Sequence, residues 1–357
     1  MAMITIAQAQ QNQTQQATTD AGFAATLTIE GAEFSIQVRD PFGGDRREKE
    51  LEFYFEEWIR LPFTDGVKAE RAEASVKDYG MALFEQVFGD RRAYSAYESV
   101  AGNLDGLEIV IEGDPGFQGL HWEALWNEGL DRPLAVDCVM VRRRRVRNGL
   151  ARVERQDSTV LNLLVVTVRP DEDQDVGYRT ISRPLVEAIE NAQLPVNVEL
   201  VRPGSWEAFV KRLDERGAGF YHLVHFDMHG ELMTFEQFRS QALRRGDQTF
   251  PAFQRGYGLP EMEAYEGVQA FLMFEGDGAG RAIAVTAQEL SDRLKQYGIL
   301  ACVLNACQSG KQVGGPLATN SGGTEPNAID GRETSLGARL MDAGMQVVVA
   351  MAYSVTV

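Results

Sequence analysis

The sequences FYHLVHFDMHG at residues 220–230 and ILACVLNACQSG at residues 299–310 are the most informative about the fold. Each is an apolar run typical of a buried β-strand, and each breaks at a reactive side chain with glycine close behind. The first run ends at His229, and the second ends at Cys307. An imidazole and a thiol at the ends of two strands can meet in space although they are distant in sequence. The two stretches therefore indicate both a sheet and a site.

Strand and helix patterns alternate around these stretches from residue 158 onward. Apolar runs predict strands at residues 161–168, 196–201, 219–226, 270–274, 300–305 and 346–352. Apolar residues at helical spacing predict helices at residues 182–192, 205–216, 287–296 and 333–343, with Ser205 as an N-cap. This alternation predicts an α/β fold with a mostly parallel sheet between helices. Reactive residues lie beyond the C-terminal ends of the strands in such sheets, where His229 and Cys307 fall.

The chain is predicted to consist of three parts. Residues 1–22 include a glutamine-rich segment and are expected to form a disordered tail. Residues 23–155 are expected to form a smaller α+β region, with strands at 24–29, 33–38, 106–112 and 134–142 and helices at 49–60, 70–88 and 119–126. Residues 156–357 are expected to form the α/β domain. Within this domain, residues 231–269 are interpreted as a polar insertion and residues 310–331 as a mobile loop rich in Gly, Ser, Thr and Asn.

Composition argues against several classes of function. The formal net charge of −17 at pH 7 opposes direct binding to nucleic acids or to anionic membranes. Three cysteines make no disulfide framework, which favours a reducing, cytoplasmic environment. No apolar run is long enough to span a membrane. The basic run at residues 142–145 could contact nucleic acid, but we interpret it as the solvated end of a strand.

The most informative side chains are those of a cysteine nucleophile and its base. Cys307 stands where the strand pattern ends and small residues follow, so we predict that it is the nucleophile. His229 is the predicted base, because a thiol nucleophile needs an imidazole within hydrogen-bond reach. The backbone N–H groups of Gly230 and Cys307 are predicted to form the oxyanion hole. Cys302, inside the same apolar run as Cys307, is interpreted as a core residue.

The remaining histidines and acids favour no metal site. His225 and His229 have the spacing of a zinc-binding helix, but Phe226 stands where that pattern requires glutamate, and the segment has a strand pattern. We therefore expect no metal and no organic cofactor. Asp227 could line a substrate pocket or could be a loop carboxylate. A dyad needs no side-chain acid if a backbone carbonyl holds the imidazole.

The motifs HFDMHG at 225–230 and LNACQSG at 304–310 together resemble those of the CHAT family of caspase-like cysteine peptidases. The resemblance covers approximately residues 100–357 and extends to WEAL at 122–125, RP at 169–170 and SLGARL at 335–340. It implies a caspase-like fold with a mostly parallel sheet flanked by helices, and a pseudo-caspase or accessory role for residues 23–155. It also implies that His229 and Cys307 cleave a peptide bond in a protein substrate.

The resemblance also implies a pocket for the side chain that precedes the scissile bond. That pocket would be formed by Asp227, Asn305, Tyr353 and Ser354. Relatives specific for basic residues carry aspartate two positions before the cysteine, and caspases carry glutamine there, whereas this chain has Asn305. We therefore expect a preference for an uncharged residue and neither strict Arg/Lys nor strict Asp specificity.

Bacterial relatives often act in antiviral defence and are switched on by a partner or by a sensor domain. By resemblance, we expect a regulatory partner or a C-terminal sensor domain, nucleotide sensing being one option. Because the family pattern continues past Val357, the C-terminal end of the domain is expected to be truncated. One alternative function is a catalytically inactive caspase-like scaffold for partner binding, and another is a cysteine-dependent amidase acting on a small molecule. The intact His229, Gly230 and Cys307 favour the peptidase.

Overall fold

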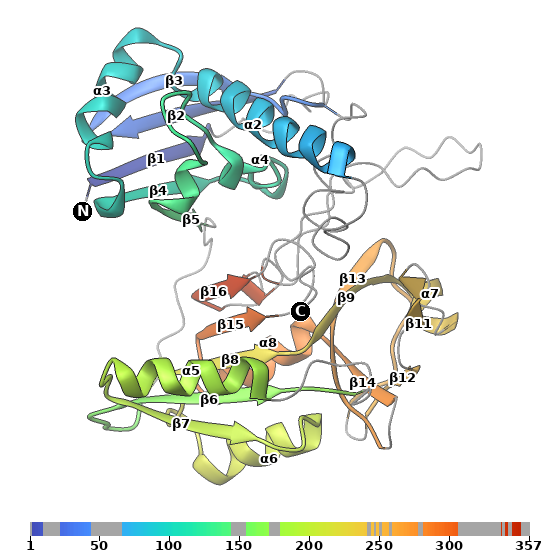
Figure 1. The fold of residues 1–357 in the computed structure, drawn as a ribbon. Helices are drawn as coiled ribbons and strands as arrows, with labels where there is room; N and C mark the ends of the chain where they lie inside the picture. Colours follow the sequence, from blue (N-terminus) through green and yellow to red (C-terminus); the bar gives the residue numbers. More distant parts are fainter. Residues whose placement is uncertain are drawn as a thin grey trace. The chain divides into compact units, whose positions relative to one another are not determined.

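The fold was analysed in a computed structural model, which describes residues 2–9, 22–43, 66–143, 155–170, 179–240, 244–245, 248–249, 252–256, 259–277, 281–305, 337, 340–341 and 345–350. These residues form two compact units. The first contains the described residues up to 143, and the second contains those from 155 onward. Figure 1 draws both units as ribbons.

The first unit is a five-stranded sheet with helices packed on one face. Its strand order is β3-β2-β1-β4-β5, with β1 antiparallel to β2 and parallel to β4. The strands are β1 (Ala2–Gln8), β2 (Phe23–Ile29), β3 (Ala32–Val38), β4 (Leu107–Glu112) and β5 (Val139–Arg143). The helices are α2 (Gly66–Phe88), α3 (Arg91–Ala101), α4 (Pro115–Gln118) and the 3-10 turns η3 (Leu104–Gly106), η4 (Trp122–Ala124) and η5 (Leu134–Val136).

Strand β1 corrects the prediction that residues 1–22 form a disordered tail. Ala2–Gln8 lies in the middle of the sheet, and the side chains of Ile4 and Ile6 are fully buried. Gln8 Nε2 donates a hydrogen bond to Asp114 Oδ2, and Gln8 Oε1 accepts the backbone N–H of Asp114, both at 2.7 Å. Ile4, Thr5 and Ile6 alternate between apolar and polar as in a strand, but this run is short, and the glutamine-rich sequence after it obscured the pattern. Residues 10–21 lie outside the described residues.

The second unit is built on an all-parallel sheet in the order β16-β15-β8-β6-β7, as the alternating pattern predicted. The strands are β6 (Leu161–Thr167), β7 (Val196–Val201), β8 (Leu223–Asp227), β15 (Ala301–Asn305) and β16 (Val347–Ala350). The helices are α5 (Arg179–Asn191), α6 (Trp206–Arg216) and α8 (Ala287–Gln296). Figure 1 shows α5 in front of this sheet and α8 behind it, so helices cover both faces.

Capping residues mark the first turns of α6 and α8 in this unit. Ser205 is the N-cap of α6, as predicted, and its side chain accepts a hydrogen bond from the N–H of Ala208. Thr286 and Glu289 form a capping box at the start of α8, in which each side chain accepts the other residue's backbone N–H. The predicted range of α8 is confirmed. These caps fix where each helix leaves the strand end before it.

A second sheet in the same unit, in the order β12-β14-β13-β9, was largely missed by the sequence analysis. Its strands are β9 (His229–Thr234), β12 (Ala252–Gln254), β13 (Val268–Glu275) and β14 (Arg281–Thr286), and nearby lie α7 (Phe235–Ser240), β10 (Arg244–Arg245) and β11 (Gln248–Thr249). Only β13 was predicted. Residues 231–269, interpreted as a polar insertion, contain most of β9, all of α7 and the short strands β10, β11 and β12. In β9, a glycine and polar residues interrupt the apolar alternation on which strand prediction relies.

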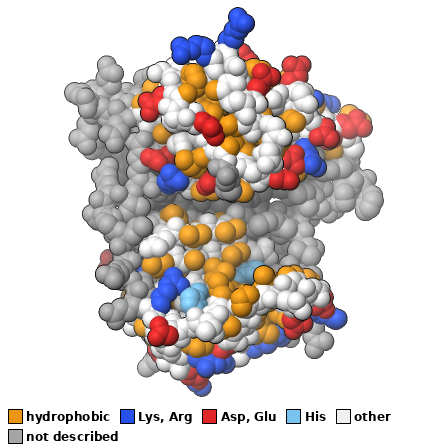
Figure 2. Space-filling model, turned by 90° about the vertical axis from the view of Figure 1, so that its left-hand side faces the viewer, with side chains coloured by type: hydrophobic (Ala, Val, Ile, Leu, Met, Phe, Trp, Pro, Cys, Tyr) orange, Lys and Arg blue, Asp and Glu red, His pale blue; other side chains and the backbone are white. Residues whose placement is uncertain are grey.

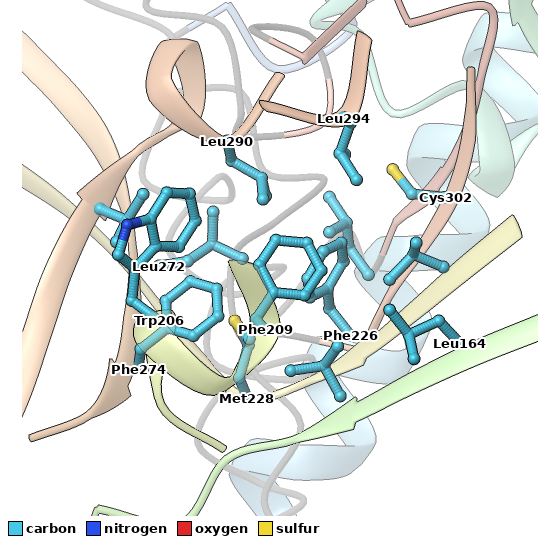
Figure 3. Close-up of a cluster of buried hydrophobic side chains, with 14 of the residues drawn as sticks. Leu164, Trp206, Phe209, Phe226, Met228, Leu272, Phe274, Leu290, Leu294 and Cys302 are labelled. Carbon is cyan, nitrogen blue, oxygen red and sulfur yellow. The ribbon is translucent and has the colours of Figure 1, made fainter. Parts of the chain in front are cut away.

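One continuous hydrophobic core joins the two sheets of the second unit. Phe209 of α6 packs against Phe226 of β8 and Phe274 of β13, with ring centroids 5.6 and 5.9 Å apart. Figure 3 shows these side chains converging, with Leu290 and Leu294 of α8 on one side and the sulfur of Cys302 at the edge. The core therefore holds β8 and β15 of the parallel sheet against β13 of the second sheet.

Several predicted boundaries differ from the structure. The predicted strand at 134–142 is a 3-10 turn followed by β5. The predicted helix at 119–126 is only the turn η4, and the strand at 219–226 is β8 at 223–227. His222 consequently precedes β8. The predicted helix at 49–60 and the loop at 310–331 lie outside the described residues, as does most of the predicted helix at 333–343.

Candidate active site

His229 lies where the two sheets of the second unit meet. Strand β8 ends at Asp227, Met228 follows, and His229 is the first residue of β9. Across the antiparallel β9–β13 pair, His229 lies opposite Met273, and Gly230 lies opposite Leu272. The sequence placed His229 three residues past its strand, whereas the structure places it two residues past β8 and within a new strand. The histidine is half-buried, and Gly230 is buried.

Three polar residues form a row across the C-terminal ends of the central strands. Thr167 of β6 is in register with Asp227 of β8, which is in register with Asn305 of β15. Residues aligned in this way on parallel strands project from the same face of the sheet. Asn305 Nδ2 donates to Asp227 Oδ1 at 3.0 Å, and the N–H of Met228 donates to the carbonyl of Asn305 at 3.2 Å. The end of β15 is thus bonded to the two residues that precede His229.

A buried ion pair holds Asp227 from the other side. Arg169, two residues after β6, places Nη2 2.5 Å from Asp227 Oδ2, and its Nη1 donates to the carbonyl oxygens of Asp227 and Val168 at 3.1 and 2.7 Å. Arg169 is 7% exposed and Asp227 4% exposed. Asp227 is therefore not a loop carboxylate, because it ends a strand and both its carboxylate oxygens accept charge-assisted or amide hydrogen bonds.

Glu275, at the end of β13, connects the second sheet to the same place. Its Oε1 accepts the backbone N–H of Arg169 at 2.9 Å, and its Oε2 accepts that of Gly204 at 2.8 Å. We call Arg169, Asp227, Asn305 and Glu275 the strand-end network. The sequence pattern pointed to Arg169 only as part of a motif, and it did not point to Glu275. The signal available was a charged residue at the end of the apolar run QAFLMFE, which identifies no partner.

The other histidines have local structural contacts. His222 Nδ1 accepts the backbone N–H of Asn162 at 3.0 Å, and burial lowers the pKa of its imidazole. His225 lies two residues before Asp227 in β8, on the same face of the sheet. Burial lowers the pKa of its imidazole, and the nearby Asp227 carboxylate opposes this effect. Its Nε2 is buried and has no hydrogen-bond partner among the described residues. Within the same residues, no cluster of three His, Cys, Asp or Glu side chains could hold a metal ion.

Two of the three cysteines lack the character of an activated thiol. Cys302 is fully buried, and burial raises the pKa of its thiol to about 12. Cys138 is half-buried, and burial, with a smaller effect from Asp137, raises the pKa of its thiol to about 11. The interpretation of Cys302 as a core residue is confirmed. Cys307, two residues after Asn305 in the sequence, lies outside the described residues, as do Tyr353 and Ser354.

The charged surface shows no basic strip on the face drawn in Figure 2, where Lys and Arg side chains are scattered among acidic ones on the described residues. Arg142, from the basic run at 142–145, lies 2.5 Å from the Glu123 carboxylate and also donates to the carbonyl of Leu120. Its charge is therefore neutralised locally. Residues 144 and 145 lie outside the described residues. No helix in the part of the chain that the structure describes has the length and apolar character needed to cross a membrane.

The fold and its site define a caspase-like α/β protein: a parallel sheet between helices, with a histidine at the C-terminal ends of its strands. The CHAT domain model matches residues 78–357, and the chain therefore belongs to the CHAT family of caspase-like cysteine peptidases. No curated protein matches the sequence. The match begins inside α2, so it includes much of the first unit as well as all of the second.

Proposed function

We propose that this protein is a cysteine endopeptidase that cleaves a protein substrate with a dyad of His229 and Cys307. The observation that carries the proposal is the position of His229, which begins β9 beside the end of β15. From Asn305, the chain needs only two further residues to reach Cys307. The high pKa values of Cys138 and Cys302 leave Cys307 as the thiol suited to nucleophilic attack.

The proposed reaction has two balanced steps. His229 takes the thiol proton as the Cys307 sulfur attacks the scissile carbonyl carbon, and His229 then gives that proton to the departing amine. A water molecule next attacks the thioester, loses a proton to His229 and releases the carboxylic acid and the free thiol. The N–H groups of Gly230 and Cys307 would stabilise the oxyanion, each donor contributing about 3 kcal/mol. Neither step requires a metal or an organic cofactor.

The proposed specificity pocket comprises Asp227, Asn305, Tyr353 and Ser354. Asp227 is the charged member of this set, and its carboxylate is neutralised by Arg169 and bonded to the Asn305 amide. A charged substrate side chain would therefore meet no uncompensated opposite charge from these residues. The arrangement supports a preference for an uncharged residue before the scissile bond.

We also propose that a regulatory partner or a sensor domain, with nucleotide sensing as one option, activates the protein in a bacterial antiviral defence pathway in the cytoplasm. The support is membership of the CHAT family together with the Gly-, Ser-, Thr- and Asn-rich sequence that follows Cys307. A partner that binds the active state more tightly than the inactive state needs only a few kcal/mol of differential affinity to shift the equilibrium between them. Under this proposal, the chain alone cleaves slowly, and its partner increases the rate.

The decisive experiment compares the wild-type protein with Cys307→Ala on a set of candidate partner proteins. Mass spectrometry would identify new termini formed by the wild-type protein and absent with the variant. Cleavage that depends on Cys307 supports the peptidase. Specific binding of a partner by both proteins without any cleavage would instead favour the alternative function, a catalytically inactive scaffold.

A further inference from the structure

The strand-end network joins the residues before His229 to the loop after β6. The Arg169 guanidinium contacts both the carboxylate and the carbonyl of Asp227 while also bonding to the carbonyl of Val168. The N–H of Val168 donates to the same Asp227 carbonyl at 2.9 Å. A guanidinium presents five N–H donors in a rigid plane, whereas a lysine ammonium offers a single point charge. The geometry around Asp227 therefore depends on arginine and not merely on positive charge.

Glu275 joins the strand opposite His229 to the same loop. Its carboxylate bridges the backbone N–H groups of Arg169 and Gly204, and its own N–H donates to the carbonyl of Gly204 at 3.0 Å. The contact is close: a Cβ at position 204 would lie 2.4 Å from the carbonyl oxygen of Thr167 and 3.0 Å from Glu275 Oε1. A glycine at this position thus allows the loop after β7 to reach the carboxylate.

These contacts close a ring that contains His229. From the Arg169 side chain the ring passes to Asp227 and along the backbone to His229. It then crosses the β9–β13 pair to Met273 and follows β13 to Glu275, whose carboxylate returns to the Arg169 N–H. The Asn305–Asp227 hydrogen bond attaches the end of β15 to the ring. The backbone of His229 is therefore held by the end of β8 on one side and by β13 on the other. The Asn305–Asp227 bond also fixes its position relative to β15, the strand that precedes Cys307.

We propose that Arg169 and Glu275 are positioning residues that hold His229 in register with the end of β15. The inference rests on the proposed function, because it concerns how the base is held against the thiol. Catalytic groups must be held within fractions of an ångström, and a misplacement of about 1 Å can cost about 100-fold in rate. Neither residue needs to touch the substrate for its loss to slow the reaction.

The rate at which iodoacetamide alkylates Cys307 at neutral pH tests the positioning role of Arg169 and Glu275, and the test needs no known substrate. A nearby imidazole increases the thiolate fraction of a cysteine and therefore its alkylation rate. The rate at Cys307, measured by mass spectrometry, is expected to fall about 10- to 100-fold in Arg169→Lys and in Glu275→Gln, and the same direction of change is expected for His229→Ala. The raised pKa values of Cys138 and Cys302 keep the background low.

Matched controls separate positioning from general destabilisation. Arg183→Lys and Glu266→Gln make the same chemical changes at exposed positions and should leave the rate unchanged. Melting temperatures verify folding, and if Arg169→Lys does not fold, Glu275→Gln alone decides. Wild-type rates in both network variants, with a slow His229→Ala, would overturn the positioning role only. A wild-type rate in His229→Ala would overturn the proposed dyad itself.

Discussion

At the scale of single residues, the proposal gives different roles to two cysteines that lie five positions apart: Cys302 packs in the core, and Cys307 is the nucleophile. Cys302 lies in the core with a raised thiol pKa, and Cys307 follows the end of the same strand. We expect Cys307→Ala and His229→Ala to abolish cleavage, because each removes an atom that reacts. Cys302→Ala should retain activity. Peptide cleavage assays measure the activity of each variant, and circular dichroism verifies its folding. Activity in Cys307→Ala together with loss of activity in Cys302→Ala would show that Cys307 is not the nucleophile.

The neutralised carboxylate of Asp227 leads to a second residue-scale prediction. A peptide library should show preference for uncharged residues before the scissile bond, because Arg169 and Asn305 occupy both oxygens of Asp227. Arg169→Met would leave that carboxylate uncompensated. Although the variant should cleave all peptides more slowly, its relative preference should shift from uncharged residues toward Lys or Arg at this position. Strict selection of Asp or of Arg by the wild-type protein would contradict this account of the pocket.

How much of the site could be predicted depended on whether its signals are local. His229 and Cys307 each follow an apolar run and precede glycine within a few residues, so the sequence alone identified them. The contact between Arg169 and Glu275 joins residues 106 positions apart, and Arg169 reaches Asp227 over 58. Nothing near either residue specifies its partner. Such contacts depend on tertiary packing, and pattern analysis cannot reveal them.

At the scale of secondary-structure elements, prediction succeeded where one pattern dominated. Buried parallel strands such as β6 and β15 are short apolar runs, and α8 begins with a capping box. Prediction failed for β1 and β9. In β1, an alternating pattern is followed at once by glutamines, and in β9 a glycine and polar residues interrupt the alternation. Both are short strands whose stability depends on their neighbours in a sheet.

The central place of β1 in its sheet gives a prediction at this scale. Ile6→Ala removes a fully buried side chain between β2 and β4, and should lower the free energy of unfolding of the first unit by about 2–5 kcal/mol. Thr5→Ala, on the opposite face of the same strand, is the matched control and should cost much less. Urea denaturation of both variants measures the difference, and equal stability would show that β1 contributes little to the unit.

At the scale of the whole molecule, two half-buried histidines of the second unit, His222 and His225, should make its stability depend on pH. Burial lowers the pKa of both His222 and His225, so the unfolded chain binds more protons than the folded chain between the folded pKa and the unfolded value near 6.5. Stability is therefore expected to decrease as the pH falls from about 6.5. The slope is at most about 1.4 kcal/mol per pH unit for each histidine. Glu123 and Glu289, whose pKa values are lowered by their arginine partners against burial, contribute only at lower pH.

Replacement of the more deeply buried histidine tests this origin of the pH dependence. His225→Gln removes the titrating imidazole and should flatten the decrease in unfolding free energy between about pH 6.5 and 5, relative to the wild-type protein. His222→Asn should flatten it less, because His222 is the less deeply buried of the two imidazoles and burial is the main cause of its lowered pKa. Urea denaturation at a series of pH values gives these slopes. If His225→Gln kept the full wild-type slope, the decrease would have to arise from groups other than this imidazole.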